Sequence, residues 1–146
     1  MKKNFLQSAS SVIFLTIVFH LPGCTLSQQS NEMKYNRRLW RKNNIVNYRF
    51  IGSSKCGAVI IKVRDGKATS IEQAFKSRVG TNLDCYEKFD TVDKIFGYVQ
   101  QQMENGKPLY VKYNEKFGFP EEIKIGSSFD TKNRISIEFT GFEAIE

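Results

Sequence analysis

Apolar positions recur along the chain with two different periods, and each period predicts one kind of element. Residues 31–42 have helical spacing, with Asn31 as the N-cap and an acidic residue in the first turn. A second helix is predicted to start after Asp90 or Thr91, since apolar residues recur there every three or four positions. Its apolar stripe consists of Val92, Ile95, Phe96, Val99 and Met103. This stripe is expected to face the core.

Between and after these helices the period is two, which indicates β-strands. The alternating segments are residues 46–50, 59–64, 67–72, 109–113, 123–125 and 135–140. Asp65-Gly66 favours a type I′ hairpin turn, because both residues tolerate positive φ. The order α-β-β-β-α-β-β-β predicts an α+β fold, an antiparallel sheet of about six strands with two helices packed on one face. The order also suggests a duplicated unit, although the two halves share no repeated residue pattern.

The chain begins with a short apolar leader that ends at a cysteine. A basic start precedes an apolar run at residues 12–19, and Gly23 stands directly before Cys24, which is the layout of a signal peptide. Residues 21–24, Leu-Pro-Gly-Cys, resemble the lipobox of bacterial lipoproteins, in which the leader is cut before the cysteine and the cysteine is acylated. The apolar run has eight residues, whereas a membrane-spanning helix needs about 20. An uncut transmembrane helix is therefore the less favoured alternative.

This leader divides the chain into a signal peptide at residues 1–23, a lipidated tether at residues 24–30 and a single α+β domain at residues 31–146. After cleavage, the remaining 123 residues suffice for one domain with its own core. The lipobox resemblance implies export and a membrane anchor at the acylated cysteine. By resemblance to sorting patterns in Gram-negative bacteria, Thr25 in place of an aspartate implies an outer membrane, with the domain facing the periplasm.

The composition adds a basic charge to this picture. The chain has 22 Lys and Arg against 15 Asp and Glu, and two of the lysines lie in the leader, so the remainder carries a net charge of +5. The expected partners are therefore anionic surfaces, such as lipid headgroups or envelope polymers, or an envelope protein. Nucleic acid is not expected as a partner, because an exported protein seldom meets it.

Five cations gather on one stripe of the first predicted helix. They are Lys34, Arg37, Arg38, Arg41 and Lys42. The opposite side, which includes Trp40, is expected to face the domain. Two interpretations of the stripe stay open. It is either a docking surface for an anionic membrane, where each exposed cation contributes about 1 kcal/mol, or a solvated face kept charged for solubility.

The sequence contains no recognisable catalytic constellation. Its single histidine, His20, lies in the leader, so the remaining chain lacks the imidazole that many hydrolases and zinc sites use. No catalytic residue, metal ligand or cofactor is therefore assigned. The residues left for a carboxylate-based hydrolase are Glu121, Glu122, Asp130 and Glu138. Glu121 and Glu122 are adjacent in a predicted strand, so they are expected to point to opposite faces of the sheet.

Cys56 and Cys85 are left as an even pair once Cys24 is acylated. In an exported protein a disulfide between them is the favoured interpretation, and two unpaired buried thiols are the alternative. Residues 73–90 show little periodicity. They are predicted to form a surface flap, which the disulfide would pin to the second strand.

Several short segments together resemble one known family. They are the helix around Trp40 leading into residues 47–50, the hairpin at 63–66, the helix start at 91–96 and the segment 111–120. The family comprises small bacterial exported lipoproteins and is catalogued only as a domain of unknown function. The resemblance thus implies an exported, lipid-anchored domain and no particular activity. Because aromatic residues at strand and turn positions usually pack in the core, the segment 111–120 is expected to be scaffold rather than a ligand site.

These observations favour a non-catalytic function. The expected molecule is a lipid-anchored protein of the cell envelope that binds another envelope component or serves as an accessory module. A small carboxylate-based hydrolase is the alternative from a different class. A protein inhibitor or assembly factor is a third, by analogy with other small helix-and-sheet domains.

Overall fold

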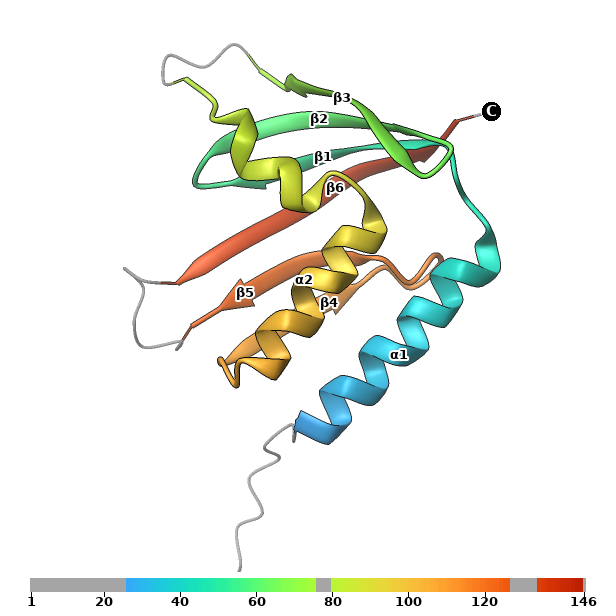
Figure 1. Cartoon of the computed structure of the whole chain (residues 1–146), viewed down its shortest axis with the longest axis vertical. Coiled ribbons are helices and arrows are strands. Elements are labelled where there is room, and N and C mark those ends of the chain that lie inside the picture. The colour runs from blue at the N-terminus through green and yellow to red at the C-terminus, as the bar shows by residue number, and fades with distance from the viewer. Residues whose placement is uncertain (1–25, 76–79, 127–133, 146) are drawn as a thin grey trace, which may run out of the picture.

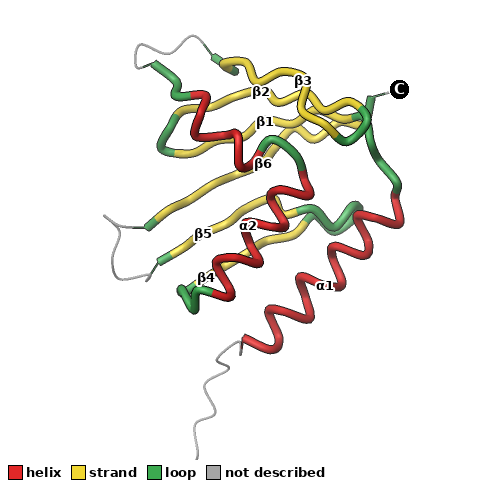
Figure 2. The backbone as a smooth tube through the Cα atoms, viewed as in Figure 1, coloured by secondary structure: helices red, strands yellow, loops and turns green. Residues whose placement is uncertain are grey.

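The domain consists of two layers, a six-stranded antiparallel sheet and a helical layer on one of its faces (Figures 1 and 2). This computed structural model describes residues 26–75, 80–126 and 134–145. Its elements are α1 (Leu26–Asn43), β1 (Tyr48–Ser54), β2 (Gly57–Arg64), β3 (Lys67–Gln73), the 3₁₀-helix η1 (Leu83–Phe89), α2 (Val92–Glu104), β4 (Leu109–Tyr113), β5 (Pro120–Ile125) and β6 (Ile135–Ala144). The predicted α+β class and the order of helices and strands are confirmed, with η1 as an added element.

The strands are arranged in the order β3-β2-β1-β6-β5-β4, and every neighbouring pair is antiparallel. β1 and β6 therefore form the centre of the sheet, and β3 and β4 form its edges. Strands β1 to β3 run from the centre of the sheet to one edge, whereas β4 to β6 run from the other edge to the centre. A two-fold rotation that kept both helices on the same face would require both sets of strands to start at the centre or both to start at an edge. The topology therefore does not support the suggested duplication.

The β2–β3 hairpin closes with the predicted turn. Asp65 and Gly66 have φ values of 49° and 72°, and two successive positive values are the mark of a type I′ turn. The amide of Asp65 donates to Asn47 Oδ1 at 2.9 Å, and the amide of Gly66 donates to the carbonyl of Val46 at 2.9 Å. These bonds tie the turn to the segment that leads into β1.

α2 also follows the prediction. Thr91 is its N-cap, and the threonine hydroxyl accepts a hydrogen bond from the amide of Lys94 at 3.3 Å. The buried members of the predicted stripe are Val92, Ile95, Phe96 and Val99. Met103, at the end of the stripe, is partly buried against the same core.

α1 begins at Leu26, five residues before the predicted N-cap Asn31. Residues 26–30, predicted as part of an irregular tether, are therefore helical. The side-chain amide of Gln29 donates to the carbonyl of Leu109 at 2.9 Å, which gives this polar first turn a partner on β4. That partner lies 80 residues away in the sequence, so a local pattern does not reveal it.

Trp40 holds α1 against the sheet. Its ring lies edge-on to the rings of Tyr48, Phe119 and Phe142, with centroid distances of 5.4, 6.3 and 5.8 Å. Such pairs contribute about 0.5–1.5 kcal/mol each beyond the burial of their area. The hydroxyl of Tyr48 accepts a hydrogen bond from the amide of Val92 at 3.0 Å, which links the cluster to the start of α2. Burial raises the pKa of Tyr48 to about 12.

η1 is part of the core, so the prediction of a surface flap at residues 73–90 was wrong for this element. Tyr86 and Phe89 are both buried. The hydroxyl of Tyr86 donates to the carbonyl of Gly57 at 2.6 Å, which fixes η1 against the sheet. Two aromatic residues three positions apart do not make a recognisable period, because a 3₁₀-helix is too short to repeat its pattern.

The β4–β5 turn brings the chain close to α1. The side-chain oxygen of Asn114 organises this turn by accepting from the amides of Lys116 and Phe117 at 3.1 and 2.8 Å. Gly118 has a φ of 81°, and a Cβ at this position would collide with the carbonyl oxygen of Asn36 in α1. The turn within segment 111–120 thus has the structural role expected from the sequence.

Gly118→Ala should destabilise the domain by about 2–4 kcal/mol, because alanine meets both an unfavourable φ and the backbone of α1. Guanidinium denaturation followed by the fluorescence of Trp40 would measure the change. Gly97→Ala is the matched control, since Gly97 lies inside α2 with nothing within 4 Å of an added Cβ. This control should gain about 1 kcal/mol. Equal stability of Gly118→Ala and the wild type would contradict the close approach.

Candidate functional site

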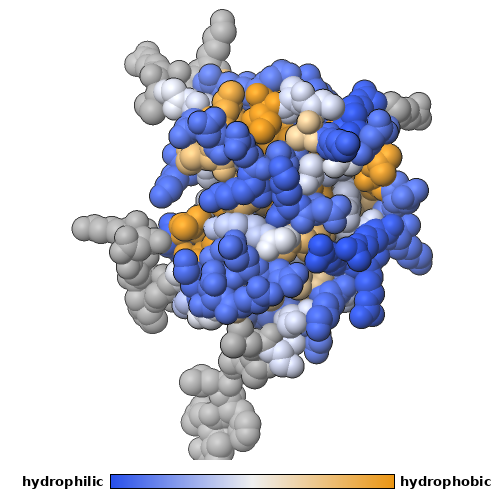
Figure 3. Space-filling model, in the orientation of Figure 1, coloured by the Kyte–Doolittle hydropathy of each residue, from blue (hydrophilic) through white to orange (hydrophobic). Residues whose placement is uncertain are grey.

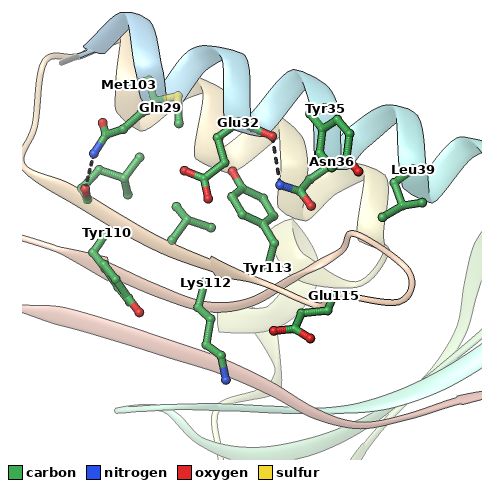
Figure 4. A pocket seen from close by; sticks show the side chains of 12 residues that line it. Gln29, Glu32, Tyr35, Asn36, Leu39, Met103, Tyr110, Lys112, Tyr113 and Glu115 are labelled. Atoms are coloured by element: carbon green, nitrogen blue, oxygen red, sulfur yellow. Dashed lines mark hydrogen bonds between the residues drawn. The ribbon is translucent and has the colours of Figure 1, made fainter. Parts of the chain in front are cut away.

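A groove with a volume of about 740 Å³ runs between α1 and the edge strand β4 (Figure 4). Its walls are formed by Gln29, Glu32, Tyr35, Asn36 and Leu39 of α1 and by all of β4, Leu109–Tyr113. Both the partly buried and the exposed side chains of β4, which alternate along the strand, line this space. The groove therefore follows the free edge of β4 rather than one face of the sheet, and we call it the edge groove.

The hydrogen bonds of β4 show which of its backbone groups face the edge groove. In an antiparallel strand, each residue directs its amide and carbonyl to the same side, and successive residues alternate. The carbonyl of Pro108 accepts from Gly126 on the β5 side, whereas the carbonyl of Leu109 accepts from Gln29 on the α1 side. The odd-numbered residues of β4 consequently present their backbone groups to the groove, and the even-numbered residues pair with β5.

α1 is fixed at both ends of the edge groove. At one end Gln29 binds the carbonyl of Leu109. At the other end the backbone of Asn36 packs directly against Gly118 of the β4–β5 turn. The space between these two points is therefore framed by specific contacts, and its width does not depend on a flexible loop.

Two large aromatic side chains are exposed along the edge groove. Tyr35 of α1 is 67% exposed and Tyr110 of β4 is 52% exposed. Tyrosine is common at protein interfaces, because it combines a large apolar ring with a polar end. These two residues make the rim of the groove suitable for contact with another protein.

The hydroxyl of Tyr113 is buried and has no hydrogen-bond partner among the described residues. Figure 4 shows the Tyr113 ring rising from β4 toward α1, with its hydroxyl beside the side chain of Glu32. Burial raises the pKa of this hydroxyl, and the negative charge of Glu32 raises it further. Most buried polar groups in proteins are hydrogen-bonded, so this hydroxyl is an exception in the inner wall of the edge groove.

Acidic side chains set the charge of the edge groove. Glu32 and Glu115 line it and are both exposed. Neither forms an ion pair within the described ranges. The one cation in the lining, Lys112, lies 3.5 Å from Glu121. The groove therefore has a local negative charge on a chain that is basic as a whole.

Four of the five predicted surface cations are exposed on the outer side of α1, and we call them the basic face. They are Lys34, Arg38, Arg41 and Lys42. Figure 3 shows a strongly hydrophilic surface over the C-terminal half of α1. Arg37 is the exception, because it is half-buried where α1 meets α2. Its guanidinium lies 5.9 Å from the centre of the Phe96 ring, and its Nη1 donates to Gln100 at 3.4 Å.

Three of the four candidate carboxylates line one hollow on the helix-free face of the sheet. They are Glu121, Glu122 and Glu138. The expectation that Glu121 and Glu122 point to opposite faces was wrong, because the β4–β5 register shifts between Lys112 and Tyr113. This β-bulge inserts Glu121 as an extra residue and breaks the alternation of the strand.

Lysine side chains balance the charge of these carboxylates. Glu121 lies 3.5 Å from Lys112 Nζ, and Glu122 lies 2.5 Å from Lys124 Nζ. Asp130, the fourth candidate, lies outside the described residues. Two of the three carboxylates in the hollow are therefore ion-paired.

The predicted disulfide is present. Cys56 in the β1–β2 turn is bonded to Cys85 in η1, with the two Cα atoms 6.5 Å apart. The bond attaches η1 to the sheet next to the Tyr86 contact. Gly23 and Cys24, the predicted residues of cleavage and lipidation, lie outside the described part of the chain.

Sequence reasoning missed the edge groove, because its two walls come from distant parts of the chain. Only the strand order shows that β4 is an edge. Two tyrosines occupy positions that the periodicity predicts to be polar, and the sequence pattern does not explain them. Tyr35 lies off the apolar stripe of its helix, and Tyr110 occupies a polar position of its strand. Exposed aromatic residues indicate a contact surface only where they gather in one place, and the fold is what brings these two to the same groove.

Fold and groove together define the class of this protein as a two-layer α+β domain with a recessed strand edge. The chain belongs to a family of unknown function (DUF6174), whose family model matches residues 32–143. This match confirms the resemblance to a family without an assigned function, and the matched region includes the residues that line the edge groove except Gln29. The chain matches no curated protein and no solved structure. Of the described helices, none is long and apolar enough to cross a membrane.

Replacing Cys56 and Cys85 together by serine should lower the free energy of unfolding by about 3 kcal/mol, because the bond closes a loop of roughly 30 residues. Urea denaturation of the variant and of oxidised wild type would measure the difference. Reduced wild type is the control and should unfold like the double variant. An intact mass that does not increase by two hydrogens on reduction would contradict the disulfide.

Proposed function

We propose that this chain is a lipid-anchored protein of the bacterial cell envelope and that it acts as a non-catalytic binding module. Cleavage after Gly23 and acylation of Cys24 would attach it to the membrane, which in a Gram-negative host is the outer membrane facing the periplasm. The lipobox-like sequence supports the anchor. The edge groove is the observation that carries the binding function, because it combines free backbone groups with exposed tyrosines.

The start of α1 brings the domain closer to this anchor than a seven-residue tether would. Only two residue steps separate Cys24 from Leu26, where α1 begins, and they span at most about 7 Å. Arg41 lies about 22 Å further along the helix, at 1.5 Å per residue. Charges act on a surface only within about 10 Å at an ionic strength of 0.1 M. Docking of the whole basic face therefore requires α1 to lie along the membrane.

The basic face supports this orientation. An acyl chain together with a basic cluster provides the two signals that stable membrane attachment takes. On α1 the groove-lining positions Glu32, Tyr35 and Leu39 lie roughly a third of a turn from the centre of the basic face. Contact between the basic face and the membrane thus leaves the edge groove open to a partner.

Cys24→Ser should release the protein from the membrane fraction, because serine cannot be acylated by the lipoprotein pathway. Fractionation of cells followed by immunodetection would measure the distribution. The matched control is the double variant Cys56→Ser, Cys85→Ser, which keeps the anchor cysteine and should stay in the membrane fraction. If Cys24→Ser cofractionates with membranes like the wild type, the attachment comes from the uncut leader or the basic face instead of an acyl group.

Changing Lys34, Arg38 and Arg41 to Gln should weaken binding to phosphatidylglycerol vesicles by up to about 100-fold, at about 1 kcal/mol per cation. The measurement uses the full chain in a Cys24→Ser background, so that no acyl group contributes. A variant with Lys62, Lys112 and Lys124 changed to Gln is the control, because it removes the same charge from the helix-free face. Equal losses in the two variants would contradict docking through α1.

A carboxylate-based hydrolase is the second candidate, and the hollow shared by Glu121, Glu122 and Glu138 is the observation that favours it. The ion pairs with Lys112 and Lys124 fit charge balance on an exposed sheet better than an acid and base pair. An inhibitor or assembly factor is a form of the binding function, and the same edge groove would serve it.

A further inference from the structure

We propose that the edge groove takes up an extended segment of another envelope protein, which pairs with β4 as a seventh strand and directs Lys or Arg side chains toward Glu32 and Glu115. This inference rests on the proposed binding function and names the chemistry of the partner. The occupant is a polypeptide in β-conformation, recognised first by its backbone and then by its positive charge.

The backbone of β4 supplies the first part of the recognition. β4 is the last strand of the sheet, and Leu109, Val111 and Tyr113 direct their amides and carbonyls away from β5. Gln29 occupies the carbonyl of Leu109. An edge strand of this kind is a template for pairing with another chain. The five residues of β4 extend over about 17 Å, which matches a segment of similar length.

The walls of the groove fit the alternating side chains of such a segment. In a strand paired with β4, successive side chains would point toward the helix layer and away from it. Those on the helix side would meet the side chains of Tyr35, Leu39 and Tyr113, which line the groove. Those on the other side would lie beside Tyr110 on the solvent face of the sheet. The helix side thus offers an aromatic contact in Tyr35, whereas the ring of Tyr110 on the other side already has Lys124 Nζ 5.4 Å from its centre.

The charge of the edge groove selects among extended segments. Glu32 and Glu115 are exposed, and neither has an ion-pair partner in the residues that the structure describes. An arriving Lys or Arg therefore displaces no existing partner. Like charges across an interface are unfavourable and opposite charges direct association, so an acidic segment is disfavoured.

A second copy of this chain is the competing occupant, and it fits less well. Its own β4 carries one cation, Lys112, which is already beside Glu121. Figure 1 shows α1 running beside β4 on the side away from β5. Pairing of two copies through β4 would bring a second α1 to the same edge, whereas a single extended segment brings no helix with it.

Val111→Pro tests the strand addition directly. The amide of Val111 faces the groove, so proline removes a donor and blocks the edge without breaking a bond to β5, and proline is tolerated at such edge positions. The probe is a fluorescent heptapeptide of alternating Lys and Val, added to the full wild-type chain in detergent micelles and followed by anisotropy. We expect Val111→Pro to bind it about tenfold more weakly or worse. Val111→Ala, the control, keeps the amide and should stay within about threefold.

Two further measurements do not depend on the folding of the proline variant. The same peptide N-methylated at every residue keeps its side chains but loses its donors, and it should bind about tenfold more weakly to the wild type. The variant Glu32→Gln, Glu115→Gln should lose most of the preference for the Lys-Val peptide over a Glu-Val peptide. The control for that variant is Glu87→Gln, Glu138→Gln, which removes two exposed carboxylates away from the groove.

The proposal is overturned by a wild type that binds no peptide, by equal binding of the N-methylated peptide, or by equal binding of folded Val111→Pro. If the wild type binds no peptide but sediments as a dimer, and Val111→Pro sediments as a monomer, then the occupant of the edge groove is a second copy of this chain and not a segment of another protein. Peptide binding is measured on isolated protein and does not require Cys24. If the peptide does not bind but Cys24→Ser leaves the membrane fraction, the groove inference is wrong and the acyl anchor stands. If the peptide binds but Cys24→Ser stays in the membrane fraction, the acyl anchor is wrong and the groove inference stands.

Discussion

The packing of Trp40 determines where α1 lies, and the position of α1 determines the surfaces with which this protein can act. One side chain contacts rings from β1, from β6 and from the β4–β5 turn. It therefore attaches the helix to both halves of the sheet at once. The absence of a Cβ at Gly118 lets the same turn approach the backbone of α1. Together these contacts hold the helix parallel to the edge of the sheet, where its sides face three different environments.

Each side of α1 has a composition that matches its environment. The side with Met33 and Trp40 is buried in the core. The opposite side carries the basic face, and the side between them lines the edge groove with Tyr35. Arg37 marks the boundary with α2, where its guanidinium packs on the Phe96 ring instead of facing solvent. A rigid helix thus couples two candidate functions, because membrane contact through one side fixes how the groove on another side is presented.

The parts of the fold that the sequence predicted correctly depend on neighbours in the chain. The turn at Asp65 follows from local φ preferences, and the start of α2 follows from a side-chain cap at Thr91. The parts that it did not predict depend on contacts between distant residues. The groove exists because strand order puts β4 at an edge, and the first turn of α1 is held by the bond between Gln29 and Leu109. The bulge at Glu121 likewise arises from the register of two strands, which alternation of residue types does not encode.

The two edges of the sheet are protected in different ways, and the difference favours binding at β4. β3 begins at Lys67 and carries an exposed ion pair between Glu72 and Lys62 at 3.2 Å. Charged side chains at an edge discourage strand addition. β4 also carries an exposed lysine, Lys112, beside Glu121 at 3.5 Å, but it differs from β3 in exposing Tyr110 and in being recessed behind α1. A recess excludes the flat edge of another sheet, which prevents aggregation, but it admits a single extended segment. Complete protection of β4 would require further side chains that bind its backbone as Gln29 does, and α1 places tyrosine and glutamate there instead.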